Sequence, residues 1–125
     1  MTKFDALKKQ YRSAVERLDE VLKVKKTDII RDSAITRFEL CFDLAWKAVK
    51  AFLEEKKGFR CASPKDCFRE AYRQGLIDYS DLWMKVTDWR NAAVHTYSEK
   101  LADQLFEKLR SVFKLFQTLK DKFEE

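Results

Sequence analysis

The stretch "RDSAITRFELCFDLAWKAVKAFLE", residues 31–54, decides the fold of this chain. Its apolar side chains recur at steps of three and four residues, which is the period of an amphipathic α-helix. The stripe comprises Ile30, Ala34, Phe38, Phe42, Ala45, Val49 and Phe52, widened by Ile35, Leu44, Trp46 and Leu53. A stripe this broad predicts a central helix that packs against neighbours on more than one side.

This central helix is predicted to span about residues 28–57. Thr27 or Asp28 can cap its N-terminus, because both side chains accept hydrogen bonds from free backbone N–H groups. At the other end, two lysines and then Gly58 supply a basic last turn and a left-handed stop.

The flanking sequence predicts four further helices. The first runs from about residue 3 to 24, and the last runs from near Ser98 to Phe123. Between them, a fourth helix in chain order begins near Asp78–Ser80 and reaches the region of Val94. Short connections favour antiparallel packing of successive helices.

A short third helix lies between the central helix and the fourth. Ser63 can cap it, Pro64 suits its first position, and Gly75 ends it. Phe68, Ala71 and Tyr72 are predicted to face inward. The sequence therefore predicts an all-α fold: an antiparallel up-and-down bundle of four main helices plus one short helix, forming a single domain over residues 1–125.

The composition supports this fold class. Of the 125 residues, 46% are hydrophobic and 38% charged, with two glycines and one proline, too few turn formers for an all-β protein. No stretch approaches the roughly 18 consecutive apolar residues of a membrane span, and the N-terminus lacks the apolar segment of a secretory signal. These features predict a soluble, cytoplasmic protein.

The three cysteines, Cys41, Cys61 and Cys67, are predicted to be structural thiols in the reduced state, because their number is odd and no export signal is present. No metal site is expected, because the spacing of Cys61 and Cys67 exceeds that of a zinc knuckle and only one histidine is available. There is also no Gly-rich phosphate loop and no paired-aspartate transferase motif. The chain is therefore not itself a nucleotidyltransferase, and we expect no cofactor.

The formal charge of +5 is unevenly distributed. Residues 1–26 carry eight Lys and Arg against four acidic residues, a local charge of +4. A basic first helix could attract a polyanion such as RNA or an acidic protein, or could simply be a solvated face.

The motif "RNAAVHTY", residues 90–97, contains the only histidine. Arg90 and His95 are five residues apart, about 140° around an ideal helix, so they share no face unless the helix ends at His95. A neutral imidazole can take a proton from a hydroxyl near pH 7, and a guanidinium can bind phosphate bidentately. This combination suits metal-independent cleavage of RNA. A histidine that merely caps a helix C-terminus is the alternative.

Two other sets of residues are weaker candidates. Glu39 and Asp43 could bind a metal, but salt bridges to Lys47 or to a partner fit their spacing better. Trp83 and Trp89 could stack on bases, although tryptophans in a helical stripe more often belong to a core or an interface.

The motif at residues 90–97 matches the arginine–polar–three residues–histidine signature of HEPN-domain proteins, with a tyrosine two positions after the histidine. Residues 31–54 resemble the second helix of the nucleotidyltransferase substrate-binding proteins, which are a HEPN branch. The order of helices also agrees, so the resemblance covers nearly the whole chain.

The resemblance implies a homodimer that assembles with a minimal nucleotidyltransferase. Related pairs are toxin–antitoxin systems, in which the HEPN protein is a ribonuclease toxin and the transferase silences it by transferring AMP to the motif tyrosine. By this resemblance Arg90 would bind phosphate, Asn91 would orient, His95 would act in acid–base catalysis, and Tyr97 would be modified.

Two functions follow from the resemblance. The first is a ribonuclease regulated by its transferase, and the second is a non-catalytic subunit that presents a nucleotide or another substrate to that transferase. For the ribonuclease, cleavage needs both a base and an acid. If both are imidazoles, two chains must contribute, because each chain has one histidine.

Overall fold

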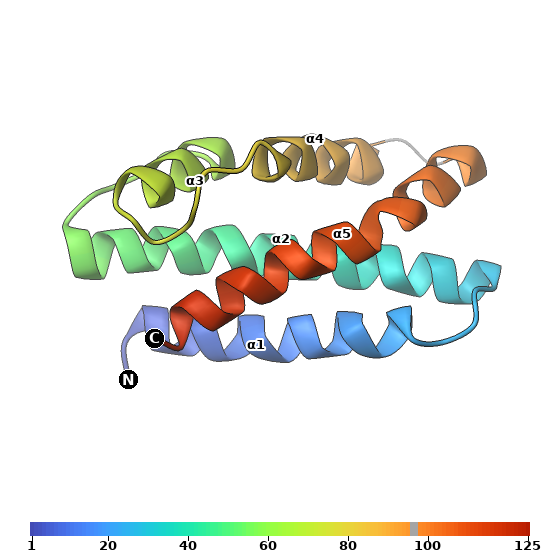
Figure 1. Ribbon diagram of the computed structural model, residues 1–125, viewed down its shortest axis with the longest axis horizontal. Coiled ribbons are helices and arrows are strands. Elements are labelled where there is room, and N and C mark those ends of the chain that lie inside the picture. Colours follow the sequence, from blue (N-terminus) through green and yellow to red (C-terminus); the bar gives the residue numbers. More distant parts are fainter. Residues whose placement is uncertain (96–97) are drawn as a thin grey trace.

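The computed structural model of the protein describes residues 1–95 and 98–125, with only the backbone described at His95. It contains five helices: α1 (Lys3–Leu22), α2 (Asp28–Lys57), α3 (Pro64–Arg73), α4 (Leu82–His95) and α5 (Glu99–Phe123). Helices α1, α2, α4 and α5 run up, down, up and down, and α3 lies beside the C-terminal end of α2 (Figure 1). The predicted all-α antiparallel bundle is confirmed.

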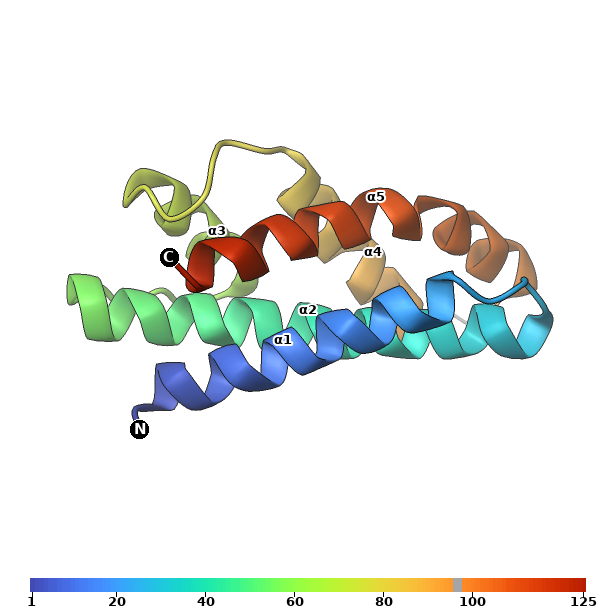
Figure 2. The same ribbon diagram turned by 60° about the horizontal axis from the view of Figure 1, so that its bottom comes forward.

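The two ends of α2 form as the sequence predicts. The Thr27 side chain accepts a hydrogen bond from the Ile30 N–H at 3.1 Å. At the other end Gly58 adopts φ 64°, a left-handed conformation that is strained for residues with a Cβ. Between these caps α2 extends along the whole bundle and packs against α1 in an antiparallel pair, with both chain termini at one end of the molecule (Figure 2).

Aromatic side chains join the helices through one core. Phe116 of α5 stacks on Phe38 of α2, with ring centroids 6.1 Å apart, and its carbonyl accepts a hydrogen bond of 2.7 Å from the buried Tyr11 hydroxyl of α1. On the other side, Phe68 of α3 stacks on Trp83 of α4 at 4.1 Å. Because these rings are buried, the core holds α4 against α2 and α5.

A buried arginine fixes the beginning of α5. Arg31, on the first turn of α2, donates to Asp32 at 3.0 Å and to Asp103 of α5 at 3.2 Å. These hydrogen bonds raise the pKa of Arg31 above its already high ordinary value. The chain segment that follows the motif is therefore anchored to α2.

Three local expectations differ from the structure. Helix α1 ends at Leu22 rather than near residue 24. Helix α4 begins at Leu82 rather than near Asp78–Ser80, because the Ser80 hydroxyl accepts from the Leu82 N–H and leaves the preceding residues outside the helix. Tyr72 is 49% exposed rather than inward-facing, and its ring packs edge-on against Tyr79 on the surface.

The prediction of three free thiols is wrong for two of them. Cys61 and Cys67 form a disulfide with Cα atoms 5.1 Å apart, because the chain turns into α3 between them. The spacing of Cys61 and Cys67 is too wide for a zinc knuckle, but it allows a disulfide across the start of α3. Cys41 is a buried free thiol, and burial raises its pKa to about 12.

In the described part of the chain, no helix combines the length and the apolar character that crossing a membrane requires. The same residues contain no group of three or more His, Cys, Asp or Glu side chains arranged to hold a metal ion.

Candidate functional site

The motif residues Arg90, Asn91 and His95 lie on the last turns of α4, and His95 is the last helical residue. Tyr97 lies outside the described residues. Because helical residues rotate by about 100° each, the backbone positions of Arg90 and His95 differ by about 140°. Arg90 is directed toward α2, whereas Asn91 is exposed.

The Arg90 guanidinium is held by α2. Its Nη2 donates to Oδ1 of Asp43 at 2.8 Å, a charge-assisted hydrogen bond, and its central carbon lies 6.0 Å from the centroid of the Phe42 ring. The partner expected for Asp43 was Lys47 or another protein. The structure instead pairs it with an arginine 47 positions later in the chain.

The remaining donors of this guanidinium are weakly used. Nη1 is 3.5 Å from Oδ1 of its neighbour Asn91, and the buried Nε has no hydrogen-bond partner among the described residues. An arginine carries five N–H donors and no acceptor. An oxyanion near Arg90 could therefore bind at Nη1 and compete with Asp43 for Nη2. This arrangement fits the predicted phosphate-binding role.

Glu39 lies one helical turn before Asp43 and belongs to the same electrostatic group. Burial raises its pKa above the ordinary value; the positive charge of Arg90 lowers it and the negative charge of Asp43 raises it, with a net upward shift. Glu39 therefore keeps its proton to a higher pH than an ordinary glutamate. The structure thus places two carboxyl groups with different environments next to one guanidinium.

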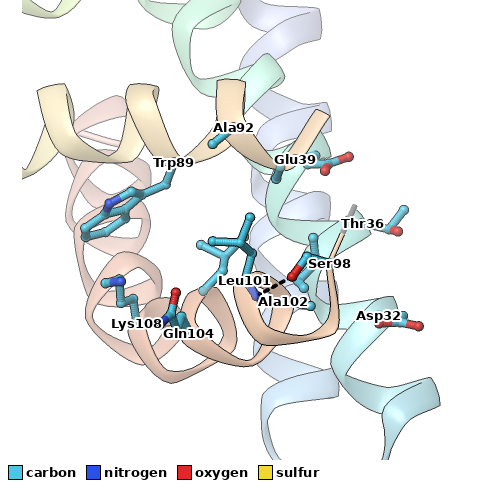
Figure 3. A pocket seen from close by; sticks show the side chains of 13 residues that line it. Asp32, Thr36, Glu39, Trp89, Ala92, Ser98, Leu101, Ala102, Gln104 and Lys108 are labelled. Atoms are coloured by element: carbon cyan, nitrogen blue, oxygen red, sulfur yellow. Dashed lines mark hydrogen bonds between the residues drawn. The ribbon is translucent and has the colours of Figure 1, made fainter. Parts of the chain in front are cut away.

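A cavity of about 330 Å³ opens beside this group, between α2, α4 and α5 (Figure 3). Glu39 and Thr36 of α2 line it on one side, and Trp89 of α4 lies across from them with Lys108 of α5. The Lys108 ammonium lies 5.1 Å from the centroid of the Trp89 ring. The volume is at the lower end of the range for small-ligand pockets, about 300–1,000 Å³.

The two candidate tryptophans differ in their surroundings. Trp83 is buried in the core against Phe68, so stacking on a base is excluded for it. Trp89 lines the cavity and is partly exposed. Sequence reasoning missed Lys108, because nothing distinguishes it from the other lysines of a solvent-facing helix.

The basic character of residues 1–26 is partly neutralised within the chain. Arg12 pairs with Glu124 at 3.5 Å, Lys23 with Asp19 at 3.0 Å, and Lys26 with Asp103 at 3.0 Å. Three of the eight basic side chains in this segment are thus paired with acidic residues of the same chain.

Replacing Asp43 with Asn should lower the free energy of unfolding by about 1 kcal/mol, because it removes a partly buried ion pair. Urea denaturation measures the change. Asp19→Asn is the matched control, since its partner Lys23 is mostly exposed and lies only four residues away in the sequence. This control should lower the free energy of unfolding by about 0.3 kcal/mol. Equal losses in the two variants would show that the Arg90 ion pair does not hold α4 on α2.

Comparison with known proteins gives the family. The family described as "Nucleotidyltransferase substrate binding protein like" matches residues 6–125. A curated relative, "Probable ribonuclease HepT" of Haemophilus influenzae, is 33% identical over 84 residues, which cover 60% of this chain and 54% of that protein. The match thus spans about half the length of that relative.

A crystal structure of a protein from Thermus thermophilus has the same fold. It superposes with a TM-score of 0.85 and 34% sequence identity, covering 92% of this chain and 99% of that one. Together with the helical bundle and the motif on α4, these matches show that the chain belongs to the nucleotidyltransferase substrate-binding protein family, a branch of the HEPN-domain proteins.

Proposed function

We propose that this protein is a metal-independent endoribonuclease, the toxin partner of a minimal nucleotidyltransferase that silences it by transferring AMP to Tyr97. One observation carries the proposal: among the described residues, Nη1 of Arg90 has only a 3.5 Å contact with Asn91 and Nε has no hydrogen-bond partner. Arg90 lies near the end of α4, which ends at His95. Family membership and the relative named as a probable ribonuclease support it.

The chemistry uses the 2′-hydroxyl of RNA as the nucleophile. His95, as a neutral imidazole, takes the 2′-OH proton, and the oxygen attacks the adjacent phosphorus. Arg90 binds the non-bridging oxygens and stabilises the charge that grows on them, while Asn91 orients the guanidinium or the phosphate. The products are a 2′,3′-cyclic phosphate and a 5′-hydroxyl.

A homodimer is part of this proposal. Large apolar side chains are exposed on the helices around the motif: Leu40 of α2 at 50%, Val94 of α4 at 49% and Leu101 of α5 at 43%. Exposed large apolar side chains of this kind are available to a protein interface. If both proton transfers use imidazole, the two His95 side chains must come from two chains. The RNA and the transferase would both be encountered in the cytoplasm, so we place the protein there.

The alternative is a non-catalytic subunit that binds a nucleotide or another substrate for the transferase. The cavity beside Trp89 supports this reading, because an aromatic wall with a lysine at 5.1 Å could accept a base and an anionic group. The two readings differ in whether the isolated protein cleaves RNA.

The purified protein should cleave single-stranded RNA in the presence of EDTA, as followed by gel electrophoresis. His95→Ala and Arg90→Ala should each slow cleavage by about 10²-fold or more, because they remove the base and the phosphate contact. Lys114→Ala, a change on the exposed surface of α5, serves as the control and should leave the rate unchanged. Inert wild-type protein that nevertheless binds nucleotides would favour the alternative function.

Co-expression with the cognate nucleotidyltransferase should add one adenylate to Tyr97, detected by mass spectrometry of the tryptic peptide. The tyrosine oxygen would attack the α-phosphorus of ATP and pyrophosphate would leave. Tyr97→Phe should abolish the adduct and leave RNA cleavage resistant to silencing. Tyr79 is an exposed tyrosine elsewhere, so Tyr79→Phe should keep both the adduct and the silencing. An adduct on another residue, or none, would remove this mode of regulation from the proposal.

A further inference from the structure

The proposed cleavage moves two protons, one from the 2′-hydroxyl and one to the departing 5′-oxygen. The chain has one histidine, so a second proton-transfer group must come from another copy of His95 or from a different side chain. This inference rests on the proposed ribonuclease function and concerns that second group.

Glu39 lies on α2, near enough to Arg90 for the guanidinium to affect its pKa, and it lines the cavity. It precedes by one turn Asp43, whose carboxylate binds Arg90 at 2.8 Å. It also borders the cavity together with Ala92 and Ala93 of α4, which directly precede the last residues of that helix, and with Ser98, which begins the following segment. Figure 3 shows the Glu39 carboxyl group beside the C-terminal end of α4, on the side of the cavity away from Trp89.

The other charged groups around this cavity have partners. Asp43 binds Arg90 at 2.8 Å, Asp32 accepts from Arg31 at 3.0 Å, and Lys108 lies over the Trp89 ring. Among the side chains that the structure describes, those of residues 1–94 and 98–125, Glu39 makes no hydrogen bond or ion pair. Its carboxyl group is therefore free to meet a ligand that reaches both the cavity and Arg90.

The surroundings also favour the protonated carboxyl. Partial burial and the neighbouring charge of Asp43 raise the pKa of Glu39, although Arg90 lowers it in part. A carboxyl group that keeps its proton closer to neutral pH can act as a general acid.

We propose that Glu39 is the general acid of the site and donates its proton to the 5′-oxygen leaving group. His95 takes the 2′-OH proton, the bond between O2′ and phosphorus forms, the bond between phosphorus and O5′ breaks, and the carboxyl proton passes to O5′. The carboxylate then regains a proton from water, and the imidazolium releases one. Each chain thus carries both groups, and proton transfer does not require a second His95.

The test compares two RNA substrates that differ at one atom. One is ordinary RNA, and the other has sulfur in place of the bridging 5′-oxygen at the scissile phosphate, so its leaving group departs without being protonated. Glu39→Gln should slow cleavage of ordinary RNA by about 10²-fold. The same variant should cleave the sulfur substrate at a rate within a few-fold of the wild-type rate. His95→Ala should be slow on both. Recovery on the sulfur substrate also shows that the variant is folded.

The matched control is Glu54→Gln, the same substitution on the same helix at a residue outside the cavity lining; it should resemble wild type on both substrates. The pH profile gives a second readout. A general acid must be protonated, so the wild-type rate on ordinary RNA should fall as pH rises through the Glu39 pKa, and this fall should be absent with the sulfur substrate.

Two results would overturn the assignment while leaving the ribonuclease function intact. In the first, the wild-type protein cleaves both substrates and Glu39→Gln lowers the two cleavage rates by the same factor, which indicates a structural role for Glu39. The other is a Glu39→Gln variant that cleaves ordinary RNA at the wild-type rate. Wild-type protein that cleaves neither substrate would instead contradict the proposed function itself.

Discussion

Burial of α2 is the constraint on which the rest of this structure depends. Its apolar stripe reaches around so much of the helix that α1, α3, α4 and α5 all pack against it, and Ala34, Phe38, Ala45 and Val49 are completely buried. The hydrophobic effect therefore determines where α4 can lie. Two polar side chains of α2, Glu39 and Asp43, thereby lie near Arg90 of α4, and Asp43 binds it.

The contact between α2 and α4 fixes the orientation of the Arg90 guanidinium. Asp43 orients the guanidinium with one strong hydrogen bond and leaves other donors weakly used, so a phosphate bound as we propose would meet a side chain that is already ordered. The same carboxylate would compete with that phosphate for Nη2. Binding should therefore depend on how much the phosphate gains beyond the contact it displaces, a balance set by residues of two helices that are distant in sequence.

The ends of α2 were predictable, because Thr27 and Gly58 act through local hydrogen bonds and backbone conformation that neighbouring residues determine. The start of α4 was not, since Ser80 bonds to Leu82 rather than beginning the helix. Helical spacing suggested Lys47 for Asp43, whereas the actual partner is brought close only by tertiary packing. The cysteine prediction failed for a different reason: it rested on the odd number of cysteines and the lack of an export signal, whereas the disulfide forms across the local turn into α3.

The surroundings of the motif were also only partly predictable. The types and spacing of Arg90 and His95 predict phosphate chemistry, but the position of Arg90 beside Asp43 and near Glu39 of α2 depends on the fold. Glu39 looked like one half of a surface ion pair. Its burial and its place beside the cavity distinguish it, and neither property can be obtained from the spacing of acidic residues in a helix.

In the proposed function, the 2′-hydroxyl of RNA is the nucleophile. The most direct measurement compares an RNA oligonucleotide with the same oligonucleotide carrying a single 2′-deoxy substitution at the mapped cleavage position, both incubated with the protein in EDTA. We expect a 2′,3′-cyclic phosphate end from the first and no cleavage at the substituted position in the second. Equal cleavage of both at that position would contradict it.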